Sequence, residues 1–276
     1  MSKFLAARPA TRLLYREDPY RQQAPACVIG HTAEGAVILD QSIFCPACGG
    51  QPGDSGWLSW AGRRLAVATA VLEPGGGADC PAGGRGRGGV ALVPAVPEQL
   101  PAVGVALVQM LDWTRRYRRM RLHTALHLLA ALVARPSAAE GIADMRAWAE
   151  FAAPAGPRSR ASAPDAATLA QRLNTLVARD LPVVGHGVTP GELRDMAVVA
   201  GKGIPLCLGG GRPAHGSDGP LRLIGIGEGG ATVDLRLCAG IHVARTGEIG
   251  AIAVERASAA EGWLRVTIAL AGELSG

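Results

Sequence analysis

The stretch Arg121-Leu-His-Thr-Ala-Leu-His-Leu-Leu-Ala130 decides how the rest of the chain is interpreted. If it is helical, His123 and His127 stand at positions i and i+4, one turn apart on the same face. Two imidazoles placed in this way are able to share one metal ion. Far downstream, Cys238 and His242 stand four residues apart in a glycine-containing segment that can turn both side chains inward. Together the four residues offer nitrogen and sulfur ligands in a set that suits tetrahedral Zn²⁺.

A histidine pair at this spacing is also common as ordinary packing or surface chemistry, and a single Cys-x3-His segment is a weaker signal. The joint pattern is more specific, because the chain has only 6 histidines and the two short segments contain three of them. Thr124 stands where a zinc protease of the His-Glu-x-x-His type carries its glutamate base. The sequence therefore predicts a zinc site and argues against peptide hydrolysis of that type.

Composition limits the class of protein. With 276 residues, 48% hydrophobic and 18% charged, the chain is expected to be globular, and two domains are the better expectation for this length. No apolar run is long enough to span a bilayer, and the first residues are too short for a secretory signal, so we expect a cytoplasmic location. The six cysteines show no framework spacing, and we expect them to be reduced thiols.

Periodicity predicts an α+β chain of two domains. Residues 1–105 contain short, frequent apolar runs typical of strands, which favours a small β-barrel. Residues 106–276 begin with a long helix that ends near 134, and a second amphipathic helix is expected over 165–180. Strands follow at 221–226, 232–237, 249–254 and 264–270. Helices followed by strands indicate an α+β domain with an antiparallel sheet and the zinc site.

Between two of the barrel strands lies the loop Gly49-Gly-Gln-Pro-Gly-Asp54. Its glycines permit positive φ and close approach of a ligand to the backbone, while Gln51 and Asp54 offer polar groups from a tight turn. An ordinary turn is the alternative. We predict a substrate pocket formed by Gly49, Gly50, Gln51 and Asp54, with Thr124 beside the histidines.

Positive charge is concentrated directly before the histidine pair, and acidic residues are absent from Trp113 up to Glu140. A solvated helix face explains most charge runs, but here nothing local neutralises it. A polyanion approaching the metal is the natural inference, and RNA, in particular tRNA, is the predicted partner. The arginines concerned are Arg115, Arg116, Arg118, Arg119 and Arg121.

Several motifs in order resemble the free-standing alanyl-tRNA editing proteins (AlaX type), relatives of the editing domain of alanyl-tRNA synthetase. They are Leu13-Leu-Tyr-Arg-Glu-Asp-Pro-Tyr20, Gly49-Gly-Gln-Pro-Gly-Asp54, Leu111-Asp-Trp113, Met120–Leu129, and Cys238-x3-His242 followed by Thr246-Gly-Glu-Ile-Gly250. The resemblance implies hydrolysis of mischarged tRNA-Ala, chiefly seryl-tRNA-Ala, with glycyl-tRNA-Ala as a second substrate. It also implies zinc ligation by His123, His127, Cys238 and His242, and a pocket faced by Gln51. The ATP-dependent charging half has no counterpart here, so we expect no ATP requirement and no membrane partner.

The chain departs from the family motif Cys-Gly-Gly-Thr-His at Ala239 and Ile241, which leaves the amino-acid preference open. The stretch Ala138–Asp144 also lacks the threonine-bearing pattern expected to recognise serine. Four protein ligands favour a zinc that positions the substrate, although a catalytic zinc stays possible if one ligand gives way. Two other functions fit the same residues: a zinc-dependent amidase or esterase on a small substrate, and a catalytically silent tRNA-binding zinc protein. The oligomeric state cannot be inferred.

Overall fold

The computed structural model describes residues 9–73, 89–133, 137–152, 165–189, 191–193, 221–260 and 263–272. The chain divides into two compact units, and the division is not a single point in the sequence. The first unit extends to Arg116, and the second contains Tyr117 onward together with the short segment Cys48–Gln51. Among the described residues, no helix combines the length and the apolar character that crossing a bilayer requires.

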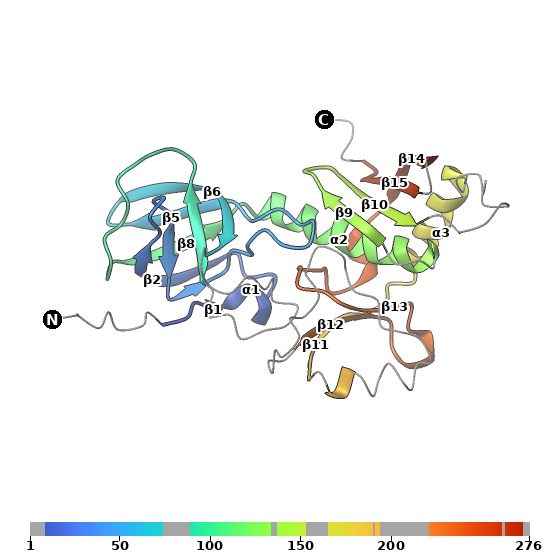
Figure 1. The fold of residues 1–276 in the computed structure, drawn as a ribbon, viewed down its shortest axis with the longest axis horizontal. Helices are drawn as coiled ribbons and strands as arrows, with labels where there is room; N and C mark the ends of the chain where they lie inside the picture. Colours follow the sequence, from blue (N-terminus) through green and yellow to red (C-terminus); the bar gives the residue numbers. More distant parts are fainter. Residues whose placement is uncertain are drawn as a thin grey trace. The chain divides into compact units, whose positions relative to one another are not determined.

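The first unit contains a closed barrel in which the strands follow the order β2-β3-β7-β6-β5-β8 (Figure 1). Every neighbouring pair in this barrel is antiparallel. A short parallel pair, β1 with β4, and one helical turn, α1, complete the unit. Its elements are β1 (Arg12–Leu13), α1 (Leu14–Glu17), β2 (Gln23–His31), β3 (Val37–Leu39), β4 (Gln41–Ser42), β5 (Gly56–Trp60), β6 (Arg63–Leu72), β7 (Val90–Pro94) and β8 (Ala106–Leu111).

The barrel forms because its strands alternate between apolar and other side chains with a period of two. In β5, Leu58 is fully buried, whereas its neighbours Trp57 and Ser59 are partly exposed. In β8, Leu107 is buried while Val108 is exposed to solvent. In these two strands one face fills the barrel and the other face meets solvent, whereas all three residues of β3 are buried.

The second unit combines helices with two antiparallel sheets (Figure 1). One sheet has the order β14-β15-β10-β9 and the other the order β11-β12-β13. The predicted small barrel and antiparallel sheets are thus confirmed. Helix α2 (Trp113–Val133) begins in the first unit and continues in the second from Tyr117. The other elements are β9 (Ser137–Ile142), β10 (Arg146–Ala152), α3 (Ala166–Ala178), β11 (Val183–Val188), β12 (Leu221–Ile226), η1 (Gly229–Ala231), β13 (Asp234–Leu237), η2 (Thr246–Ile249), β14 (Ile252–Ala260) and β15 (Trp263–Leu270).

Helix α2 starts where its sequence provides a cap. The Asp112 carboxylate accepts a hydrogen bond from the backbone N–H of Arg115 at 3.2 Å, and the Asp112 carbonyl accepts from that of Arg116 at 3.0 Å. Leu122, Leu126 and Leu129 are almost fully buried. The helix therefore exposes little of its central part, and the histidines that it carries lie in the interior.

Asp54 and Arg116 form an ion pair inside the first unit, with both side chains 1% exposed. The Arg116 guanidinium also donates to the carbonyls of Pro19 and Ile43. The Asp54 carboxylate in turn accepts from the backbone N–H of Cys45 at 2.6 Å. This geometry corrects two expectations: Asp54 is occupied as a structural anion rather than facing a substrate, and Arg116 is enclosed and cannot reach a phosphate.

We predict that Asp54→Ala destabilises the protein strongly, by about 3–5 kcal/mol, because it leaves the Arg116 cation buried without its partner. Urea unfolding followed by circular dichroism measures the change. The exposed pair Arg12–Glu17, at 2.7 Å, provides the control, and Glu17→Gln should change the free energy of unfolding far less than Asp54→Ala. Equal effects of the two substitutions would contradict the structural role given to Asp54.

Candidate metal centre and its supporting residues

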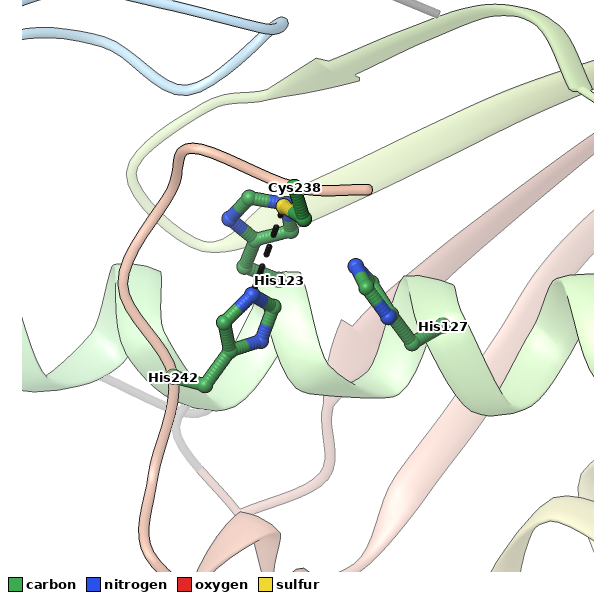
Figure 2. A group of neighbouring side chains, drawn as sticks. All are labelled: His123, His127, Cys238 and His242. Atoms are coloured by element: carbon green, nitrogen blue, oxygen red, sulfur yellow. Dashed lines mark hydrogen bonds between the residues drawn. The ribbon is translucent and has the colours of Figure 1, made fainter. Parts of the chain in front are cut away.

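The structure brings together the four residues that the sequence predicts as ligands. Helix α2 supplies His123 and His127, and the segment after strand β13 supplies Cys238 and His242 (Figure 2). All four are at most 5% exposed. One ligand atom from each residue lies within 4.8 Å of the corresponding atoms of the others. The Cys238 sulfur is 3.4 Å from Nε2 of His123 and 3.4 Å from Nε2 of His242.

Each histidine is held through its outer ring nitrogen, Nδ1. His123 Nδ1 lies 2.7 Å from the amide oxygen of Gln51, and His127 Nδ1 lies 2.8 Å from the Asp234 carboxylate. His242 Nδ1 lies 3.2 Å from the Thr124 hydroxyl, which itself donates to the carbonyl of Met120. These three partners therefore all act as acceptors, so each Nδ1 carries a proton and the neutral form of each ring has its lone pair on Nε2.

This pattern fits a bound metal ion. Metal-ligating histidines almost always donate their second ring N–H to a carboxylate, carbonyl or similar acceptor, which fixes the tautomer and the ring orientation. Three Nε2 lone pairs and one sulfur, buried within a few ångströms of each other, form a donor set of the kind that holds tetrahedral Zn²⁺. The chemistry of this cluster therefore fits a metal ion, and zinc is the metal that this donor set suits best.

Gln51 reaches the cluster from a tight turn. Cys48 and Gln51 exchange both backbone hydrogen bonds, at 2.9 and 3.0 Å, and the two residues between them, Gly49 and Gly50, have φ of 62° and 76°. Positive φ at both central positions is the requirement of a type I′ turn, and glycine meets it without strain. The glycine pair thus sets the direction in which the Gln51 side chain leaves the backbone.

Close packing explains a second glycine. A Cβ atom on Gly240 would overlap the imidazole ring of His123 and would approach the Gln51 amide oxygen to 2.8 Å. Gly240 therefore permits the ligand-bearing segment to pass directly over the His123 ring. The backbone N–H of Ile241 then donates to the same Gln51 oxygen at 3.2 Å.

Asp234 and Arg236 form the least expected part of the site. Both residues lie in strand β13 and are buried. The Arg236 guanidinium donates hydrogen bonds of 2.6–3.0 Å to the Asp234 carboxylate. Burial lowers the pKa of His127, but its hydrogen bonds with Asp234 and Cys238 outweigh this and raise that pKa to about 9. Burial, with the neighbouring His123 and His127, holds the pKa of His242 well below its usual range.

The other predicted site residues take different positions. Thr124 is fully buried and acts as the Nδ1 partner of His242, so it supports a ligand rather than lining an open pocket. Arg119 is also buried, with Asp144 at 3.8 Å, and it is unsuited to contact a polyanion. Arg115, Arg118 and Arg121 keep partial exposure. Cys48 takes part in a disulfide, so the expectation of a reduced thiol is wrong for this residue.

Sequence reasoning missed Asp234, Arg236 and the burial of two arginines, although signals existed. Arg116 and Arg119 stand seven and four residues before His123, on the face that the helix buries. In β13, the apolar Leu235 is more exposed than the charged residues on either side of it. A pair of opposite charges two residues apart in a strand, directly before a ligand cysteine, was the sign of a buried ion pair.

Comparison with known proteins agrees with this geometry. Residues 221–267 match the family described as "Threonyl and Alanyl tRNA synthetase second additional domain". Alanine–tRNA ligase of Pyrobaculum arsenaticum is 31% identical over 256 residues, covering 90% of this chain and 25% of that protein. The chain is homologous to alanyl-tRNA synthetase. The enzyme of Korarchaeum cryptofilum is also 31% identical, over 259 residues with the same coverage.

The resemblance to alanyl-tRNA editing proteins that the motifs indicate is thereby confirmed. A shorter match, to alanine–tRNA ligase of Thermococcus kodakarensis, is 36% identical over 127 residues and covers 46% of this chain. The chain spans about a quarter of the length of the first synthetase relatives that it matches. The activity of the complete synthetases therefore does not transfer to it directly.

We predict that Asp234→Asn weakens zinc binding by about 10- to 100-fold, because the neutral amide is a poorer acceptor for the His127 Nδ1–H. Competition with a chromophoric chelator measures the affinity. Glu150→Gln, which removes a more exposed carboxylate paired with Arg265 at 2.9 Å, is the control and should leave the affinity unchanged. If both variants bind zinc like the parent protein, Asp234 does not support the metal site.

Zinc affinity is also expected to rise with pH. Without metal, His127 holds a second ring proton below its pKa of about 9, and a metal ion must displace that proton. The affinity, corrected for the chelator's own protonation, should increase by about tenfold per pH unit for each proton displaced, and the His127 contribution to this slope should end above about pH 9. Asp234→Asn lowers this pKa and should flatten the curve. The same pH dependence in both proteins would contradict the assignment to His127.

Proposed function

We propose that this chain is a trans-editing deacylase that hydrolyses the ester of mischarged tRNA-Ala, with seryl-tRNA-Ala as the main substrate and glycyl-tRNA-Ala as the second. The homology to alanyl-tRNA synthetase supports the tRNA, and the buried cluster supports zinc as the cofactor. His123, His127, Cys238 and His242 would hold the ion, with Gln51, Asp234 and Thr124 orienting the three rings.

The single observation that carries the proposal is the Gln51 amide. Its oxygen accepts from His123 Nδ1 and from the backbone N–H of Ile241, but its nitrogen, Nε2, is buried and has no hydrogen-bond partner within the described residues. A buried donor without a partner costs about 1–3 kcal/mol. A protein can retain this energetic cost where a bound substrate supplies the missing acceptor. The Gln51 oxygen already contacts His123, so Nε2 of the same amide lies close to the metal cluster.

In the proposed hydrolysis, the residues around the cluster have separate roles. When bound, zinc supplies a positive charge that attracts an electron pair of the aminoacyl group. Gln51 donates its free Nε2–H to the carbonyl oxygen of the ester, where negative charge develops as water attacks. Because the four side chains that would hold the metal are buried, bulk water is excluded from around them. The water proton passes to the departing ribose oxygen, so the products are the free amino acid and the intact tRNA.

Selectivity is expected to depend on Ala239 and Ile241, which are 8% and 1% exposed. The family motif carries glycine and threonine at these positions, and Ile241 replaces a hydroxyl with a branched apolar group. Ile241 nevertheless keeps the backbone hydrogen bond to Gln51. We therefore propose that the hydrolytic contacts survive and that preference between seryl and glycyl esters differs from that of the motif's usual form.

The partly exposed arginines Arg115, Arg118 and Arg121 remain the proposed contacts for the tRNA backbone, whereas Arg116 and Arg119 are withdrawn because they are buried. Deacylation of tRNA should therefore weaken with added salt. Hydrolysis of a small ester by a zinc esterase would not show this dependence, and a silent tRNA-binding protein would show binding without hydrolysis.

Deacylation of seryl-tRNA-Ala and glycyl-tRNA-Ala by the parent protein and its variants, each prepared with zinc and assayed for bound zinc, tests the proposal. Gln51→Glu keeps an oxygen facing His123 but removes the Nε2 donor, and we expect kcat to fall by about 10²-fold while zinc is retained. His127→Ala should lose both zinc and activity. Gln171→Ala, on the exposed face of α3, is the matched control and should act like the parent protein. Unchanged rates in Gln51→Glu, or no hydrolysis of either ester by the parent protein, would refute the proposal.

A further inference from the structure

The outer wall of the barrel carries a hollow of about 580 Å³ that lies wholly within the first unit. Its volume is within the range of pockets that take a ligand of nucleotide size. Leu111 contributes to its lining near the end of β8. The other residues around it are Tyr20, Gln22, Gln23, Trp57, Arg64 and Met110.

The strand register explains how these residues come together. Gln23 of β2 is the direct partner of Met110 in β8, and Met110 is the direct partner of Trp57 in β5. Direct partners in antiparallel strands point to the same side of a sheet. Their chain neighbours Ala24 and Leu58 are buried in the barrel, so this row faces outward. Three neighbouring strands therefore build one continuous outer surface.

The surface combines a flat aromatic group with a positive charge. The Arg64 guanidinium carbon lies 4.4 Å from the Trp57 ring centre, and no carboxylate within the described residues forms an ion pair with Arg64. Arg64 is the one charged residue among those around the hollow. Asp18, close to Tyr20 in the chain, is engaged by the Tyr20 backbone N–H and by Arg21.

Polar groups able to read a base edge stand beside the ring. Gln22 and Gln23 are exposed, and within the described residues their side-chain amides make no hydrogen bond. Each amide offers both a donor and an acceptor. Tyr20, just before Gln22 in the chain, adds a second aromatic group, and its ring centre lies 5.9 Å from that of Trp113. An aromatic face, a cation and free amides match a nucleobase with its phosphate better than an acidic peptide, which presents no flat ring.

We propose that this hollow binds a nucleobase of a single-stranded RNA segment, with the base stacking against Trp57 and a neighbouring phosphate pairing with Arg64. Stacking of a base on an aromatic side chain is the common means by which proteins hold single strands without reading their sequence. The proposal rests on the deacylase function only for the identity of that RNA as part of a tRNA. The binding site itself is independent of the metal cluster.

The test is the binding of a fluorescently labelled single-stranded RNA of about ten nucleotides, followed by fluorescence anisotropy with the full chain. Trp57→Ala and Arg64→Ala should each weaken binding by about 5- to 20-fold, and Trp57→Phe should restore most of the loss. Trp60 and Arg63 provide matched controls, since their ring and guanidinium form a similar pair at 5.5 Å on the same two strands but do not line the hollow. Trp60→Ala and Arg63→Ala should change binding by less than about twofold.

Thermal unfolding of each variant identifies any loss of folding. If Trp57→Ala is unstable, the binding measured with Arg64→Ala still tests the proposal. Parent-like binding by Arg64→Ala and by any folded Trp57 variant would overturn the proposal. An equal loss in all four alanine variants would also overturn it, because that indicates unspecific attraction to positive charge. The RNA carries no amino acid, so failure here leaves the deacylase proposal intact, and a protein without deacylase activity would still show the Trp57 effect.

Discussion

The outward-facing nitrogen of each imidazole is the constraint on which the site depends. Three histidine rings and a thiol cannot be enclosed together at random, because every buried polar atom needs a partner. The three Nδ1 atoms find theirs in an amide, a carboxylate and a hydroxyl, from the turn at Gln51, the strand β13 and the helix α2 itself. Only the inner nitrogens and the sulfur are then left for an ion.

This arrangement also explains why distant parts of the sequence are bound to one another. The helix sets the separation of His123 and His127 along the chain but does not fix the orientation of their imidazole rings. That orientation is fixed by Gln51, far earlier in the chain, and by Asp234, far later. Arg236 neutralises Asp234 within the protein, so the carboxylate can remain charged in a place where an isolated anion would be costly.

The sequence allowed much of this to be predicted, and the limits have a physical cause. The long helix, the small barrel, the late strands and the clustering of His123, His127, Cys238 and His242 follow from periodicity and from the rarity of histidine. The burial of Asp54, Arg116 and Arg119 could not be predicted from the run of arginines, because the same sequence pattern occurs whether the arginines face water or pair with a buried carboxylate. Asp234 was equally hidden, since an alternating strand normally turns its charged residues outward, and here Asp234 and Arg236 are inside because they satisfy each other and a ligand.

Steric crowding restricts which residues can stand beside the cluster. A side chain at position 240 would displace the His123 ring, and a side chain at position 50 would strike the carbonyl group of Glu140, so both positions are closed to variation. Ala239 and Ile241 flank the closed position and already differ from the usual motif. The two flanking positions accept side chains, whereas shape alone requires glycine at positions 50 and 240.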